Sequence, residues 1–325
     1  MLRIENLKKF FPVKGGFFGR HIGKVHAVDD VSFSVGEGET LGLVGESGCG
    51  KSTLARTILR LYEPSSGKIF FQNEELTGLS SGEMRKKRRE MQMIFQDPVA
   101  SLNPRMTVGS ILEEPFIVHK VKNKDEIAAL LPQLLQRVGL SEDALTRYPH
   151  EFSGGQRQRI CIARALALNP KFIVCDEPVS ALDVSIRSQI LNLLVELRND
   201  YKLAYLFISH DLAVIEHISD RVAVMYLGKI VELSENAELF ARPAHPYTKA
   251  LMLSIPRAEF EEGSKRLENA AKLISGDVPS PFRPPSGCHF HPRCPLATDF
   301  CKKEAPDLRK IGPVDHPHWV ACHYA

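Results

Sequence analysis

The sequence predicts an α/β protein, and three observations support this. Apolar runs of strand length at residues 40–44, 172–177 and 203–208 alternate with stretches whose apolar residues recur at helical spacing. A glycine-rich segment at residues 45–52 joins the first of these runs to a helical stretch. The chain of 325 residues is long for one core, so a large domain with a smaller second one is expected.

The glycine-rich segment has the pattern of a phosphate-binding loop. It reads Gly-Glu-Ser-Gly-Cys-Gly-Lys-Ser, which fits G-x-x-x-x-G-K-[ST]. A strand that turns through glycines into a helix directs backbone N–H groups and the positive end of the helix dipole to one point, which suits an anion. The lysine can reach the outer phosphates, and the serine hydroxyl can hold Mg²⁺. The residues predicted to bind the nucleotide here are Gly45, Ser47, Gly48, Cys49, Gly50, Lys51, Ser52 and Thr53.

The segment before the loop is predicted to form strands at residues 2–11 and 25–35, where polar and apolar residues alternate. Aromatic side chains in and after the first strand can stack on a nucleotide base, and core packing is an equal alternative for each. These aromatic residues are Phe10, Phe11, Phe17 and Phe18.

Two further elements follow the loop before the next strand. Residues 69–71 are predicted to form a short strand, and residues 81–89 an exposed basic helix. The run of five basic residues at 85–89 is typical of a nucleic-acid patch, but a solvated helix face is favoured. The net charge of the whole chain, +3, is too small to indicate nucleic acid.

Gln96 ends a strand predicted at residues 91–95. A glutamine at a strand end can reach a metal ion or a water molecule beside the terminal phosphate, although the residue alone means little. Asp-Pro and Asn-Pro pairs then break regular structure. Residues 108–138 have apolar side chains at helical spacing, which predicts a helical insertion in the α/β pattern.

Residues 152–156 read Phe-Ser-Gly-Gly-Gln and open a second helix. Its N-terminus is a second potential anion site. One nucleotide does not need two such sites from one chain. We therefore expect Ser153, Gly154, Gly155 and Gln156 to close on a nucleotide held by another subunit.

Two adjacent carboxylates, Asp176 and Glu177, end the buried strand at residues 172–177. Because successive side chains of an extended chain point to opposite faces, Asp176 can hold the Mg²⁺ shell while Glu177 polarises the attacking water. Asp183 follows, and then an amphipathic helix. His210 comes directly after the strand at residues 203–208, where it can hydrogen-bond a γ-phosphate.

The order of these motifs resembles the nucleotide-binding subunit of an ABC transporter. The resemblance covers about 165 residues, from the phosphate loop through Gln96, residues 153–156, Asp176 and Glu177 to Asp183 and His210. It implies an ABC-type P-loop NTPase: a RecA-like core with an N-terminal antiparallel β subdomain and a helical insertion. Two such subunits associate head to tail, with ATP between the phosphate loop of one and residues 153–156 of the other.

The resemblance also implies the role of each residue. Lys51 and the loop amides bind the β- and γ-phosphates, while Ser52, Gln96 and Asp176 hold Mg²⁺. Glu177 is the general base, His210 contacts the γ-phosphate, and Asp183 acts across the dimer interface. Phe11 stands where relatives usually place a tyrosine on the adenine, so it keeps the stacking face and lacks the hydroxyl.

Four segments resemble the dipeptide and oligopeptide importer ATPases: residues 147–152, 177–185, 245–248, and the tail from 276 onward. Importers of nickel and other solutes share parts of this pattern. The resemblance implies a paralogous second ATPase, two transmembrane permease subunits and an extracytoplasmic peptide-binding protein as partners, with no nucleic acid. The expected place is the cytoplasmic face of the cell membrane, because no apolar run reaches the ~18 residues of a membrane span and no signal peptide is recognisable.

Two alternatives to an importer ATPase remain at this point. A soluble ABC protein acting on ribosomes or DNA generally has two cassettes or a long coiled coil, whereas this chain has one cassette and no long heptad run. A non-hydrolysing regulatory subunit is disfavoured by the intact Glu177. The predicted domains are residues 1–255 for the ATPase, with a helical subdomain at about 97–165, and residues 256–325 for a Cys-rich extension.

Four of the seven cysteines, Cys288, Cys294, Cys301 and Cys322, lie in the last forty residues of the chain. Four thiolates can surround one metal centre, and small segments without a core often need such a link. Zinc or a [4Fe–4S] cluster would accept them. Tails of this kind in peptide-importer ATPases resemble ones that carry [4Fe–4S], so the cluster is the prediction, zinc is the alternative, and four free thiols are the third possibility.

Overall fold

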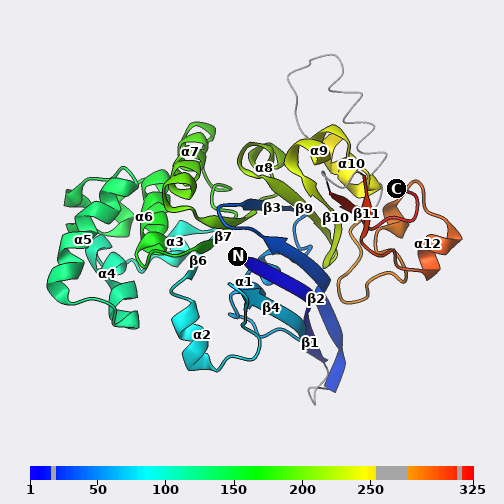
Figure 1. Ribbon diagram of the computed structural model, residues 1–325, viewed down its shortest axis with the longest axis horizontal. Coiled ribbons are helices and arrows are strands. Elements are labelled where there is room, and N and C mark those ends of the chain that lie inside the picture. Colours follow the sequence, from blue (N-terminus) through cyan, green and yellow to red (C-terminus); the bar gives the residue numbers. More distant parts are fainter. Residues whose placement is uncertain (16–19, 254–276, 313–316) are drawn as a thin grey trace. The chain divides into compact units, whose positions relative to one another are not determined.

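The computed structural model describes residues 1–15, 20–253, 277–312 and 317–325. These residues form two compact units. Unit 1 comprises residues 1, 35–39 and 78–208, and unit 2 comprises residues 2–34, 40–77 and 209–325. Figure 1 shows the elements of both units in the colours of the sequence.

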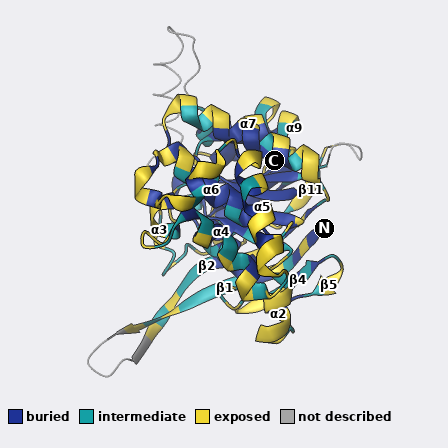
Figure 2. Cartoon of the chain, turned by 90° about the vertical axis from the view of Figure 1, so that its left-hand side faces the viewer, coloured by how far each residue is buried: buried dark blue, intermediate teal, exposed yellow. Residues whose placement is uncertain are grey.

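Unit 2 contains a four-stranded sheet in the order β2-β1-β4-β5. β1 pairs antiparallel with β4, and its buried side chains Leu2 and Ile4 alternate with exposed Arg3. A positive φ of 47° at Asn6 accompanies an irregularity in this pairing, after which Leu7 is the next buried residue. The outer parts of β1 and β2 are largely half-buried or exposed (Figure 2). The strands are β1 (Leu2–Gly15), β2 (Arg20–Val35), β4 (Ser66–Phe71) and β5 (Glu74–Glu75).

A second group of strands in unit 2 has the order β11-β12-β10-β9-β3. β3 and β9 are parallel, while β9 and β10 form a hairpin through Gly228, whose φ is +81°. Near the C-terminus, β12 pairs antiparallel with β10 and so adds the chain end to this sheet. The strands are β3 (Thr40–Val44), β9 (Arg221–Tyr226), β10 (Lys229–Glu235), β11 (Arg309–Ile311) and β12 (His318–Val320). The helices of this unit are α1 (Lys51–Ile58), α8 (Leu212–Ile218), α9 (Asn236–Ala241), α10 (Pro246–Leu253), the 3₁₀ helix η3 (His291–Arg293) and α12 (Asp299–Lys303).

Unit 1 contains three parallel strands in the order β8-β7-β6. Every residue of β7 and β8 is buried, as expected for apolar strands covered on both faces. The helices α4, α5 and α6 pack on one another (Figure 1). The strands are β6 (Met91–Ile94), β7 (Phe172–Asp176) and β8 (Ala204–Ile208). The helices are α2 (Ser81–Lys87), α3 (Pro98–Ser101), α4 (Val108–His119), α5 (Lys124–Arg137), η1 (Glu142–Thr146), η2 (Pro149–Glu151), α6 (Gly154–Leu166) and α7 (Val184–Tyr201).

The helical insertion predicted at residues 108–138 consists of two helices. Lys120 ends α4 in the left-handed conformation. Asn123 then begins α5 with a capping box, in which its side chain accepts from the Glu126 N–H and the Glu126 carboxylate accepts from the Asn123 N–H. These local signals divide into two helices a stretch whose apolar periodicity is continuous.

Among the described helices, none is both long enough and apolar enough to cross a membrane.

Candidate functional site

The phosphate-binding loop lies in unit 2 between β3 and α1, as predicted. Gly45 and Gly50 have φ of 155° and 111°, and a Cβ at these positions would collide with the Met225 and Ala27 carbonyl oxygens respectively. Only glycine therefore fits both the backbone angle and the close approach. The structure thus brings Gly45, Ser47, Gly48, Cys49, Gly50, Lys51, Ser52 and Thr53 into one turn and the first residues of α1.

Lys51 is 5% exposed and lies inside this loop. Its Nζ donates to the carbonyl oxygens of Gly45 at 2.7 Å and Glu46 at 3.0 Å. Cys49 is buried beside it, and burial raises the pKa of the Cys49 thiol despite the nearby Lys51 charge. The loop therefore holds an ammonium group at the N-terminus of α1, which is the charge that an anionic ligand needs.

Two residues from the C-terminal part of the chain contact the loop, and neither was predicted to belong to the site. The Arg293 guanidinium donates to both carboxylate oxygens of Glu46, at 2.8 and 3.0 Å. The Tyr247 hydroxyl accepts from the Glu46 N–H at 2.8 Å. Burial acts to lower the pKa of Arg293, but the hydrogen bonds to Glu46 and Tyr226 outweigh it, so that the pKa of Arg293 is raised and its guanidinium stays charged.

His210 is an exposed residue two positions after the end of β8, and the residue before it contacts β3 near the start of the loop. The preceding Ser209 donates its N–H to the Leu43 carbonyl at 3.2 Å, two residues before Gly45. The Ser209 hydroxyl accepts from the Asp211 N–H at 3.0 Å. This local network fixes the backbone on both sides of His210.

The carboxylate pair lies at the end of β7 in unit 1. Asp176 is 1% exposed, whereas Glu177 is half-buried with a φ of 49°, a left-handed conformation that is strained for a residue with a side chain. Gln96 Nε2 donates to Glu177 Oε2 at 3.1 Å. The structure therefore joins Gln96 and Glu177, two predicted site residues that are 81 positions apart.

Ser153 to Gln156 form the N-terminus of α6, also in unit 1. Ser153 and Gln156 make a capping box: the Ser153 hydroxyl accepts from the Gln156 N–H at 3.3 Å, and Gln156 Oε1 accepts from the Ser153 N–H at 3.0 Å. Gly155 is buried against Ile186 of α7, so close that a Cβ would collide with it. Ser153, Gly154 and Gln156 are exposed, as is Asp183 at the start of α7.

Phe11, predicted to stack on adenine, is half-buried on β1. Its ring lies edge-on to Tyr62 at 5.4 Å, and Lys9 Nζ lies 4.8 Å from its centre. Phe10 instead packs on His26 at 4.3 Å. Of the other two aromatic candidates, Phe17 and Phe18 lie outside the described residues.

The structure does not confirm the metal centre that was predicted in the tail. Among the described residues, no group of three or more His, Cys, Asp or Glu side chains is placed to hold a metal ion. The prediction that Cys288, Cys294, Cys301 and Cys322 bind a [4Fe–4S] cluster, or zinc in its place, is therefore wrong. All four are free cysteines, and burial raises the pKa of Cys288 to about 11.

The C-terminal segment is held by a shared core instead. Phe290 is 1% exposed and packs edge-on against Tyr226 at 5.2 Å and near Tyr247 at 5.5 Å. His318 Nε2 lies 2.6 Å from Glu232 Oε1, and both side chains are buried. The prediction assumed that so small a segment needs a metal because it lacks a core. That premise fails, since the segment packs into unit 2.

Two family profiles match the chain. The family described as "ABC transporter" matches residues 28–180, and the one described as "Oligopeptide/dipeptide transporter, C-terminal region" matches residues 231–301. The second match spans part of the tail that holds Arg293.

The chain is also similar to known transport proteins over almost all its length. It is 53% identical to the oligopeptide transport ATP-binding protein AppF of Bacillus subtilis, over 99% of this chain and 97% of that protein. It is 52% identical to a probable peptide ABC transporter ATP-binding protein of Sinorhizobium fredii, over 99% and 89%. Both relatives are named for peptide or oligopeptide transport, so the alternatives of nickel import and of action on nucleic acid are not favoured.

Solved structures agree on the fold. The dimeric ATP-binding cassette MJ0796, bound to ADP and phosphate after hydrolysis, matches with a TM-score of 0.64 and 30% identity over 73% of this chain and 99% of that one. CbiO1 of Clostridium perfringens matches with a TM-score of 0.63 and 29% identity, over 74% and 90%.

The phosphate loop, the α6 N-terminus and these similarities define an ABC-type ATPase cassette with an antiparallel β subdomain and an α/β core. The chain belongs to the ABC transporter ATP-binding proteins of the oligopeptide/dipeptide importer type.

Proposed function

We propose that this chain is the ATP-hydrolysing subunit that powers the uptake of di- and oligopeptides through an ABC importer. The observation that carries this proposal is the similarity over 99% of the chain to a protein named for oligopeptide transport. The buried Lys51 in the phosphate loop and the Gln96–Glu177 contact support the hydrolytic part.

Within one chain, Lys51 and the loop amides bind the β- and γ-phosphates, His210 contacts the γ-phosphate, and Phe11 stacks on the adenine. The hydroxyl of Ser52, the amide oxygen of Gln96 and the carboxylate of Asp176 would hold Mg²⁺, which prefers oxygen ligands. When bound, the ion neutralises charge that develops on the phosphates.

Glu177 is the general base in this proposal. Gln96 Nε2 donates to its Oε2, which orients the carboxylate while the other oxygen can accept a proton from the attacking water. The strained backbone at Glu177 fixes the direction of this side chain.

A second ATPase subunit completes each site. The exposed N-terminus of α6 presents backbone N–H groups to a nucleotide held by the neighbouring subunit, and Asp183 acts across the same interface. The residues that would act on the partner's nucleotide are Ser153, Gly154, Gly155, Gln156 and Asp183.

The partners and the domains follow from this assignment. The second ATPase is a paralogue, two permease subunits receive the movement through residues 96–115, and an extracytoplasmic protein delivers the peptide. The chain works at the cytoplasmic face of the cell membrane. The ATPase domain spans residues 1–255, with its helical subdomain at about 97–165, and the small Cys-rich extension spans residues 256–325.

The direct test is the substitution Glu177→Gln. We expect ATP hydrolysis to fall by about a hundredfold or more, because a general base contributes roughly 10²–10⁴ in rate. ATP binding, measured by equilibrium titration, should change less than threefold. The control is Glu216→Gln, an exposed carboxylate on α8. Unchanged turnover in Glu177→Gln would remove Glu177 as the base.

A further inference from the structure

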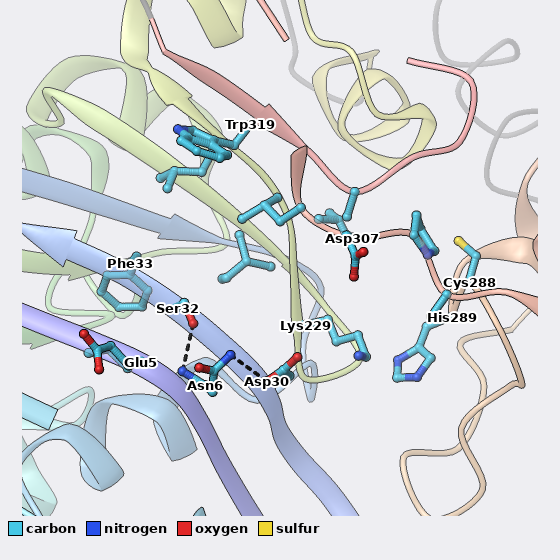
Figure 3. A pocket seen from close by; sticks show the side chains of 18 of the residues that line it. Glu5, Asn6, Asp30, Ser32, Phe33, Lys229, Cys288, His289, Asp307 and Trp319 are labelled. Atoms are coloured by element: carbon cyan, nitrogen blue, oxygen red, sulfur yellow. Dashed lines mark hydrogen bonds between the residues drawn. The ribbon is translucent and has the colours of Figure 1, made fainter. Parts of the chain in front are cut away.

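A cavity of about 760 Å³ opens in unit 2, and none of the predicted ATP-site residues lines it. Its walls come from β1, β2, β10 and the C-terminal segment (Figure 3). Sites for small molecules commonly have volumes of 300–1,000 Å³. The cavity is therefore large enough for a ligand that the proposed ATPase cycle does not use.

The cavity has apolar walls that include aromatic side chains. Phe33, Val231 and Leu233 line it and are 5–6% exposed. Trp319 of β12 is half-buried there. These side chains suit an apolar group of a ligand, because its burial removes apolar surface from water.

Charged residues of both signs also line the cavity: Arg3, Glu5, Asp30, Arg221, Lys229 and Asp307. Four of these have partners: Arg3 pairs with Glu5, Asp30 accepts from Asn6 Nδ2 at 3.2 Å, and Arg221 donates to the Ser34 carbonyl.

Lys229 and Asp307 differ from these four. Figure 3 shows both side chains extending into the same space. Within the part of the chain that the structure describes, neither side chain makes an ion pair or a hydrogen bond. Opposite charges that share a cavity without pairing suit a ligand that brings the complement of each.

We propose that this cavity binds a short peptide with free termini, and that its occupancy changes the affinity of the phosphate loop for ATP. The peptide carboxylate pairs with Lys229, its ammonium group pairs with Asp307, and its apolar side chains cover Phe33 and Trp319. The choice of ligand rests on the proposed function, because an importer delivers such peptides to the compartment where the ATPase works.

The polar end of the cavity is connected to the phosphate loop by the β9–β10 turn. The Gly228 N–H donates to the Cys49 carbonyl at 2.9 Å, and Lys229 is the next residue. On the other side of the turn, His289 Nδ1 lies 3.1 Å from the Leu227 carbonyl. A ligand that moves Lys229 or His289 therefore acts on the backbone that holds Cys49 in the loop.

Trp319 makes the test direct, because the chain has one tryptophan. The full chain is titrated with leucyl-leucine while tryptophan fluorescence is recorded. We expect a saturable change, and Lys229→Gln or Asp307→Asn should weaken binding at least tenfold. Lys303→Gln, a lysine on α12 outside the cavity, is the matched control and should change the affinity less than twofold.

Blocked peptides assign each charge. The C-terminal amide of leucyl-leucine lacks the carboxylate, so it should bind the wild-type chain weakly, and Lys229→Gln should weaken its binding no further. N-acetyl-leucyl-leucine lacks the ammonium group, so it should also bind the wild-type chain weakly, and Asp307→Asn should weaken its binding no further. Equal affinity for free and blocked peptides, or no saturable signal, would overturn the site.

The coupling is read from the affinity for a fluorescent ATP analogue with and without saturating leucyl-leucine. We expect at least a fivefold change, the lower end of typical couplings between sites. Peptide binding with unchanged ATP affinity would overturn the coupling. ATP hydrolysis is measured on the same samples: an active ATPase that ignores the peptide refutes the cavity proposal alone, whereas an inactive one refutes the proposed function.

Discussion

The chain presents two glycine-containing helix N-termini that can bind an anion, and they differ in how they are held. The N-terminus of α1 is tied to its surroundings: Lys51 is buried, and Arg293 and Tyr247 hold the loop through Glu46. The N-terminus of α6 is exposed at Ser153 and Gly154 and is closed by its own capping box.

The difference explains how one chain can serve two nucleotides. A loop supported on several sides can hold a nucleotide by itself, because little ordering is left for the ligand to impose. An exposed helix N-terminus that keeps its shape without a ligand is suited to dock on a nucleotide that another chain already holds. Substitutions at α1, at α6 and at the contacts that hold the phosphate loop separate these two roles.

The largest effect is expected for Lys51→Met. Removal of the ammonium group from the phosphate loop should abolish ATP binding and lower hydrolysis by about a thousandfold, since electrostatic stabilisation of transferring phosphate is a dominant contribution. Nucleotide titration and phosphate release measure the two quantities. Lys86→Met, an exposed lysine on α2, is the control. Retained ATP binding in a folded Lys51→Met chain would refute the role of α1.

Ser153→Arg should lower hydrolysis by about a hundredfold in the assembled importer and leave ATP binding by the isolated chain within twofold of wild type. An arginine at the N-cap removes the hydroxyl acceptor and obstructs the partner's nucleotide. The control is Ser188→Arg, an exposed serine on α7. Loss of ATP binding by the isolated Ser153→Arg chain would mean that both helix N-termini serve the same nucleotide.

The support of the loop is tested by Arg293→Met. Arg293 is buried and Glu46 is partly exposed, so breaking their ion pair should cost about 2 kcal/mol of unfolding free energy, below the 3–5 kcal/mol of a fully buried pair. The affinity for ATP should fall about threefold to tenfold. Arg242→Met breaks the pair that the exposed Arg242 makes with Glu238 in the same unit, and should cost far less than Arg293→Met.

The double variant Glu46→Gln with Arg293→Met serves as the second control. It removes the carboxylate that the single variant leaves without its partner, and should regain part of the lost stability. Chemical denaturation measures all four proteins. Equal costs for Arg293→Met and Arg242→Met would contradict a structural role for the Arg293 contact.

The smallest effect concerns pH. Burial lowers the pKa of His245 to about 4, and its Nδ1 accepts from the N–H of Tyr247, the residue that supports the loop. Below pH 6.5 the unfolded chain gains a proton that the folded chain does not, so the unfolding free energy should fall by about 1 kcal/mol from pH 7 to pH 5.5. His245→Asn should remove this part of the pH dependence, whereas a substitution of the exposed His217 on α8, His217→Asn, should keep it. An unchanged pH dependence in His245→Asn would contradict the assignment.

The sequence predicted the two helix N-termini well because each is a local pattern. Each pattern occupies only a few consecutive residues of the chain: the glycines at 45 and 50, the capping pair at 153 and 156, and the apolar runs of β7 and β8. Patterns formed by residues close together in the chain can be recognised from the amino-acid sequence.

The supports of the loop were not predictable in the same way. Arg293 and Glu46 are 247 positions apart, and Tyr247 is 201 positions from Glu46. Neither residue type stands out at its position. The four cysteines of the tail led to the prediction of a metal. The contacts that hold the tail in unit 2 are instead the packing of Phe290 on Tyr226 and the pairing of β12 with β10. Long-range packing of ordinary residues leaves no local signature.

Whether each nucleotide lies between two chains can be measured by photoaffinity labelling of the importer purified with its partner chains. This chain carries Lys51→Met, so it cannot hold the nucleotide itself, and an ATP analogue with a photoreactive γ-phosphate is activated by light. We predict that mass spectrometry finds the label on residues 153–156 of the Lys51→Met chain. Labelling confined to other chains, with none on these residues, would contradict the account.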